Sequence, residues 1–241
     1  MKRLILSLVL AFLLPSLSWA ATPTYDSDDD SGVINNQQNP SYTHTPTGGA
    51  CPDCADFIGV CWQDSTPGTL SSVTSGGNAA TSLGAALDSG GGNKIFGQMF
   101  LYPGASTSAH TIQANFSEII NSVTIHTITF SNVHQTVSTG TRATATGFGT
   151  AVTVDVSSAT GEVVVDLMCS PDRTATAGAG QTDRANFNDA TNHRHAGSQE
   201  AGAATTTMSW TLGSNANWGT QGIALKPTID SVSNFYRRRG Q

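Results

Sequence analysis

The sequence predicts an all-β protein: a two-sheet antiparallel β-sandwich of jelly-roll type with almost no helix. Only 12% of the 241 residues are charged, while Gly, Ser, Thr and Val, which favour strands and turns over helices, are plentiful. Short strand-like segments recur between turn signals, as they do in sandwiches. A propeller or solenoid is disfavoured because no convincing internal repeat is present.

The clearest strand patterns lie in the last third, at residues 161–167, 205–212 and 220–227. In the second of these the side chains alternate with a period of two, the spacing of a half-buried strand. The face expected to be buried carries Thr206, Met208, Trp210 and Leu212.

Five further strands are expected before these, at residues 56–62, 95–102, 111–116, 123–130 and 150–156. In 123–130 the apolar phase slips between Ile125 and Ile128, which predicts a bulge near His126 and Thr127. The run 89–93, Ser-Gly-Gly-Gly-Asn, is expected to be a loop because consecutive glycines are costly inside a strand.

The chain divides into four parts. Residues 1–20 combine Lys2 and Arg3, the apolar run 4–14 and the small-x-small site 18–20, the pattern of a secretory signal peptide. Residues 21–48 are acidic and polar, which predicts a flexible arm or an edge strand. The sandwich is expected over 49–227 and a tail over 228–241. No second apolar run could span a membrane, so the protein is expected to be secreted, extracellular or on the cell surface.

The charge argues against nucleic acid as a partner. The formal net charge is −6, and removal of Lys2 and Arg3 leaves nine basic against seventeen acidic side chains, a net charge of −8. Phosphates bind to basic surfaces, which this composition does not favour.

Four cysteines in an exported chain favour two disulfides: Cys51, Cys54, Cys61 and Cys169. Three connectivities are possible, and the strand faces favour Cys61–Cys169 and Cys51–Cys54. The alternatives are a redox pair, which would need a helix behind it, and a zinc site completed by His193 and His195. The spacing His-x-His in a polar segment is more typical of solvent-facing side chains.

Residues 26–32 place Asp26, Asp28 and Asp30 two apart, as in a calcium-binding loop. The full pattern needs glycine at the sixth position and glutamate at the twelfth, whereas Gly32 is seventh and Gln37 twelfth. A solvated acidic segment is therefore favoured over a calcium site.

Six segments, taken together and in this order, resemble a known module: residues 128–136, 161–166, 178–182, 197–203, 208–212 and 222–227. They resemble a β-sandwich module that recurs in exported and surface proteins of bacteria and in phage-associated sequences. The likeness extends more loosely back to about residue 49. It implies the fold and carries over no catalytic residues.

No catalytic motif or cofactor-binding motif is found, so the protein is expected not to be an enzyme and to need no cofactor. Glu162 and Asp166 share a strand face, but an ordinary outward face has the same pattern, and glycosidases need two carboxylates across a cleft. Trp210 falls on the apolar face and is expected in the core.

Two functions fit these observations. The first is a non-catalytic structural or surface-interaction protein that associates with copies of itself, with the acidic segment adding a strand to an open sheet edge. The alternative is a carbohydrate-binding module that binds surface glycans through exposed loop side chains: Trp218, Asn186, Asn188 and Asn192.

Overall fold

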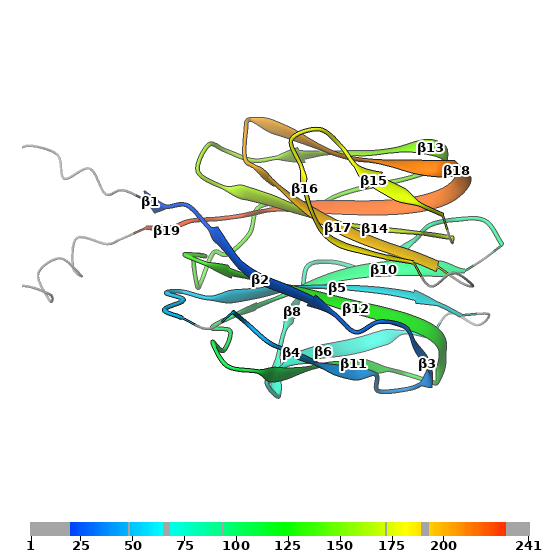
Figure 1. Cartoon of the computed structure of the whole chain (residues 1–241), viewed down its shortest axis with the longest axis horizontal. Coiled ribbons are helices and arrows are strands. Elements are labelled where there is room, and N and C mark those ends of the chain that lie inside the picture. The colour runs from blue at the N-terminus through cyan, green and yellow to red at the C-terminus, as the bar shows by residue number, and fades with distance from the viewer. Residues whose placement is uncertain are drawn as a thin grey trace, which may run out of the picture.

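The computed structural model describes residues 20–47, 49–64, 68–92, 94–171, 173–188 and 193–229. These residues form antiparallel strands and turns and contain no helix, so the all-β sandwich class is confirmed (Figure 1). The predicted signal peptide, apart from Ala20, and most of the predicted tail lie outside the described residues.

Three main sheets are stacked in the order upper, central and lower (Figure 1). The central sheet consists of β2 (Thr24–Asp30), β12 (Ile120–Ser131), β5 (Ala55–Gln63), β10 (Ile95–Pro103) and β8 (Thr81–Ser82), with β3 (Ile34–Gln37) beside β12 and β9 (Leu87–Asp88) beside β10. The lower sheet consists of β4 (Ser41–His44), β11 (His110–Phe116), β6 (Leu70–Ser75) and β7 (Asn78–Ala79).

The upper sheet follows the order β13 (Ala143–Ser157), β18 (Thr205–Leu225), β14 (Val163–Pro171), β17 (His193–Ala201) and β16 (Thr182–Asn188), with β15 (Ala175–Ala177) paired to β18. At one end of the stack β1 (Ala20–Ala21) pairs with β19 (Thr228–Ile229), so the two ends of the described chain lie side by side (Figure 1).

The structure has three stacked sheets where the sequence predicted two, because the central strands bury both faces. In β5, Phe57 packs into the core shared with the upper sheet and Ile58 into the core shared with the lower sheet. The same holds in β12, which explains the irregular apolar phase there. The predicted bulge near His126 and Thr127 was wrong, since β12 pairs with β5 without a register shift from Ser122 to Phe130.

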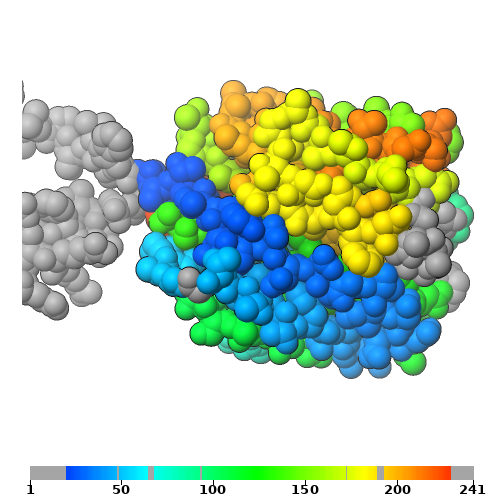
Figure 2. All heavy atoms as spheres, in the orientation of Figure 1, coloured from blue at the N-terminus to red at the C-terminus, as the bar shows by residue number. Residues whose placement is uncertain are grey.

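The N-terminal segment is not a free arm. β2 and β3 pair with β12, and β4 pairs with β11, so residues 24–44 complete the central and lower sheets. Of the two predicted alternatives, the edge strand describes this segment. Figure 2 shows it, in blue, lying across the face of the molecule beside the yellow strands of the upper sheet. The sandwich therefore begins well before residue 49.

The second and third strand phrases of the last third are one continuous strand, β18, rather than two strands joined by a loop. The upper sheet folds over itself along this strand and β13. Residues 205–212 of β18 lie over the part formed by residues 216–225, and two further hydrophobic clusters fill the space between these parts. Gly222 permits this approach, because a Cβ added there would lie 2.5 Å from Val156 Cγ2.

Both disulfides are present in the pairing that the strand faces favoured. Cys61–Cys169 joins β5 to β14 and so links the central and upper sheets. Gly97, the register partner of Cys61 on β10, leaves room for this bridge, because an added Cβ would lie 2.6 Å from Cys169 Sγ. Cys51–Cys54 closes a turn of three residues' separation.

We expect Gly59→Ala to lower the free energy of unfolding by about 1–3 kcal/mol, because the added methyl would enter a filled core. It would lie 2.7 Å from His126 Nδ1 on the neighbouring strand. Urea unfolding measures the change. The matched control is Gly92→Ala, where an added Cβ meets nothing within 4 Å. Equal effects of the two substitutions would contradict the packing described here.

The two disulfides are expected to contribute unequally. Cys61–Cys169 closes a separation of 108 residues and Cys51–Cys54 one of 3. Because the entropy removed from the unfolded chain grows with loop length, the double substitution of Cys61 and Cys169 by Ala should cost about 2–5 kcal/mol. The same change at Cys51 and Cys54 should cost much less. Thermal unfolding of the two variants in parallel tests this order, and the reverse order would refute it.

Candidate functional site

Among the residues suggested for glycan binding, the three that the structure describes do not gather into an exposed site. Trp218 is only 8% exposed and packs in the core between the two halves of the folded upper sheet. Its register partner on β13 is Gly147, which leaves space for the ring, since an added Cβ would lie 2.5 Å from Trp218 Cζ2. The sequence placed Trp218 in a loop, whereas it is part of β18. Its ring is therefore enclosed.

The asparagines lie elsewhere. Asn186, on β16, donates from Nδ2 to the Ala175 carbonyl at 3.0 Å and to Asp183 Oδ2 at 2.6 Å, and its side-chain oxygen accepts from Arg194. This side chain is occupied by internal partners. Asn188 is at the exposed end of the same strand, and Asn192 lies outside the described residues.

The three alternate aspartates of the acidic segment have separate partners. Asp26 accepts from the Thr47 hydroxyl at 3.0 Å, Asp30 accepts from the Gly32 amide at 2.8 Å, and Asp28 lies 4.0 Å from Arg184 of β16. Within the described ranges no group of three or more His, Cys, Asp or Glu side chains could hold a metal ion.

The histidines of the zinc alternative are buried, not solvent-facing. His193 and His195 lie on β17 and point into the interface with β12, where His193 Nε2 is 3.0 Å from Thr124 Oγ1 and His195 contacts His126. Burial lowers the pKa of His126 to about 3 and that of His195 well below its usual value, so both rings are neutral. Both cysteines that would complete the site are in a disulfide.

Asp166 does not lie on an outward face. It is fully buried and accepts hydrogen bonds from the Ser198 amide at 2.7 Å and from the Trp210 indole at 2.7 Å. Burial raises the pKa of this carboxyl to about 7. Trp210 is in the core as predicted, and its polar edge is satisfied by Asp166.

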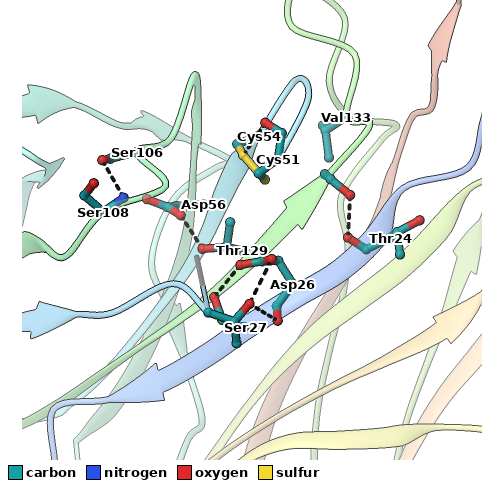
Figure 3. Close-up of a disulfide and its surroundings, with 12 residues drawn as sticks. Thr24, Asp26, Ser27, Cys51, Cys54, Asp56, Ser106, Ser108, Thr129 and Val133 are labelled. Atoms are coloured by element: carbon teal, nitrogen blue, oxygen red, sulfur yellow. Dashed lines mark hydrogen bonds between the residues drawn. A yellow bond between two sulfur atoms is a disulfide. The ribbon is translucent and has the colours of Figure 1, made fainter. Parts of the chain in front are cut away.

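The most concentrated polar site, which the sequence did not indicate, lies at one end of the interface between the central and lower sheets. Its centre is Asp56 of β5, a fully buried carboxylate. Asp56 Oδ2 accepts from the Ser75 hydroxyl at 2.7 Å and lies 2.9 Å from His110 Nε2, while Oδ1 accepts from the Thr129 hydroxyl at 2.7 Å. The bond to Thr129 is drawn in Figure 3.

His110 is an imidazolium in this arrangement. Its Nδ1 lies 2.8 Å from the Ser108 carbonyl and its Nε2 faces the Asp56 carboxylate, so neither neighbour has a proton to give. The hydrogen bond to Asp56 raises the pKa of His110 above its usual value, against the opposing effect of burial. A second ring, His44, lies edge-on to His110 with centroids 5.3 Å apart, and burial lowers its pKa.

Ser75, Asp56 and His110 do not form a nucleophilic triad. In such a triad the serine donates to the histidine and the carboxylate orients the other ring nitrogen. Here the Ser75 hydroxyl donates to Asp56, and His110 has no unprotonated nitrogen to act as a base. The arrangement holds a buried ion pair and activates no nucleophile.

A pocket of about 240 Å³ opens beside His110, where the β6–β7 turn meets the end of β10 and the following loop. In the sequence, the one feature that could have pointed to this site is the charged residue Asp56 at the start of an otherwise apolar strand. His110 comes from a segment 54 residues away, so the pair could not be read from spacing.

Comparisons with models of protein families, with curated proteins and with solved structures find no match to this chain. The resemblance to exported bacterial and phage-associated modules therefore stays a prediction. The fold and the disulfides define an all-β sandwich protein suited to an oxidising environment. None of the described residues forms a helix long and apolar enough to cross a membrane.

Asp56→Asn should lower the pKa of His110, because it removes the charge that stabilises the imidazolium. An NMR titration of the imidazole resonances measures this directly. A raised folded-state pKa stabilises the protein below the unfolded value of about 6.5, and the stabilisation is lost as the pH rises through the folded value. The stability difference between wild type and the variant should therefore shrink at alkaline pH.

The control for this prediction is Ser75→Ala, which removes one hydrogen bond to Asp56 and keeps the charge. The pKa of His110 should then change much less. If Asp56→Asn leaves the pKa of His110 unchanged, Asp56 is not the cause of the raised pKa.

Proposed function

We propose that the protein is a non-catalytic, exported surface-interaction protein that associates with copies of itself through the open edge of β13. The observation that carries this proposal is the length of that edge. β13 has 15 residues and pairs along its length with β18, and no other described strand pairs with it.

The composition of β13 supports pairing. Exposed edges are commonly protected by lysine, proline or inward-pointing charge. β13 contains no Lys, Arg or Pro, and its only charge is Asp155, which accepts from the Thr207 hydroxyl. A register shift between Gly149 and Ala151 divides the edge into two halves. The first half, 143–149, is free of charge and is the better candidate for pairing.

The first half of the β13 edge also carries an exposed aromatic side chain, Phe148. Its side chain is 70% exposed, although large aromatic side chains are normally covered. In an antiparallel pair of copies centred on Thr146, Phe148 lies opposite Thr144 of the other copy, an aromatic and β-branched pair of the kind that stabilises sheets. Association of identical edges about a two-fold axis closes the assembly as a dimer.

In this proposal the acidic segment does not add a strand to another copy, as the sequence suggested. Its strands are already paired within their own chain, so it is not a free donor of a strand. Export is supported by the N-terminal pattern of charge and apolar residues and by the two disulfides.

The substitution Thr146→Lys tests whether two copies pair through the β13 edge. In the proposed pair two positive charges would face each other across the two-fold axis, which disfavours pairing. Light scattering coupled to size exclusion should give a dimer for the wild type and a monomer for the variant. Thr211→Lys makes the same charge change on β18, inside the sheet, and should leave the dimer intact. A wild-type monomer at millimolar concentration would refute the proposal.

A further inference from the structure

The pocket beside His110 is built from segments that are held in place. The β6–β7 turn consists of Gly76 and Gly77, both with positive φ, as a two-residue hairpin turn of this type requires. The Gly76 amide also donates to the Thr111 carbonyl at 2.9 Å, which pins the turn to β11. This wall is therefore formed before any ligand arrives.

The opposite wall is the loop between β10 and β11. The amides of Gly104 and Ala105 both donate to the Cys54 carbonyl, at 2.7 and 3.2 Å, so the turn closed by Cys51–Cys54 holds the loop. Further along, the Ser108 amide donates to Ser106 Oγ at 3.0 Å (Figure 3). A pre-formed pocket loses less conformational entropy when a ligand binds.

The charges in the pocket cancel. His110 is the only charged side chain in the lining, and Asp56 beneath it balances that charge. Both N–H groups of His110 are already used, by Asp56 and by the Ser108 carbonyl, so an anion gains no donor from the ring. A cation would find no free carboxylate among the lining residues. The pocket therefore favours an uncharged ligand.

The remaining lining groups are polar and include one aromatic ring. Ser106 accepts the Ser108 amide and keeps its own proton free to donate. Asn78 uses an amide N–H for the Gly76 carbonyl at 3.5 Å and keeps its oxygen as an acceptor. Tyr102, half-buried at the end of β10, is the one aromatic residue of the lining.

We infer that this pocket binds a single neutral sugar ring at the end or in a branch of a glycan. A sugar ring has an apolar C–H face that packs on an aromatic ring and a rim of hydroxyls that both donate and accept. Its uncharged, hydroxyl-rich surface matches the balanced charges of the pocket. The volume of about 240 Å³ is below the range of pockets for drug-sized ligands, which limits the occupant to a single ring. The site is distinct from the edge of β13 and does not depend on self-association.

The test is an NMR titration of the isotopically labelled protein with methyl glycosides of glucose, galactose, mannose, rhamnose and N-acetylglucosamine. At least one glycoside should shift the resonances of Tyr102, Ser106 and the His110 ring in a saturable way, with a dissociation constant in the millimolar range. Inorganic phosphate and ammonium, titrated in parallel, should produce no saturable shift there. If every glycoside fails, or if phosphate alone saturates the site, the inference is wrong.

Variants assign the binding to the pocket. Tyr102→Leu removes the ring and should weaken binding by about 3- to 10-fold, the size of a lost aromatic contact. Ser106→Ala should weaken it several-fold, while Ser108→Ala is the control, because Ser108 holds the loop and His110 through its backbone. An unchanged amide spectrum away from the pocket confirms that each variant is folded. Binding that survives Tyr102→Leu and Ser106→Ala unchanged would place the sugar elsewhere and overturn the assignment.

Discussion

The pairing of β5 with β12 in the central sheet is the constraint on which the rest of the structure depends. These strands are buried on both faces, so each of them must present apolar side chains in two directions. One set forms the core with the upper sheet and the other the core with the lower sheet. Hydrophobic burial is the main favourable contribution to folding. Without this pair the lower sheet would lose its core, and the upper sheet would keep only the clusters between its own folded halves.

Burial on both faces also determines where the polar groups lie. A polar side chain on a doubly covered strand cannot reach water and needs an internal partner. Asp56 on β5 has Ser75, Thr129 and His110, and His126 on β12 has His195. The two sites differ in charge because Asp56 supplies a counter-charge for His110, whereas burial keeps His126 and His195 neutral. The pocket lies beside the charged site, at the edge of the stack where the interface opens.

The N-terminal segment shows how tertiary context overrides composition. Residues 24–30 carry four aspartates, a composition typical of a solvated arm, yet they form β2. The reason is that β12 offers a full edge of backbone donors and acceptors. The carboxylates of Asp28 and Asp26 reach partners outside the core, Arg184 and Thr47. Likewise Trp218 follows an Asn-rich stretch that reads as a loop, and it is enclosed only because the upper sheet folds over itself.

The sequence by itself determined the all-β class and the positions of seven of the nineteen described strands, and it favoured one of the three possible cysteine pairings. Side-chain alternation and strand faces are local properties, so they can be recognised in the sequence. Only the tertiary structure decided the third layer, the continuity of β18, the burial of Trp218 and the meeting of Asp56 with His110. These features depend on which strands become neighbours. A strand that is buried on both faces is a continuous apolar run, and its sequence pattern does not distinguish it from a buried helix. Contacts between distant segments produce no periodic pattern in the sequence.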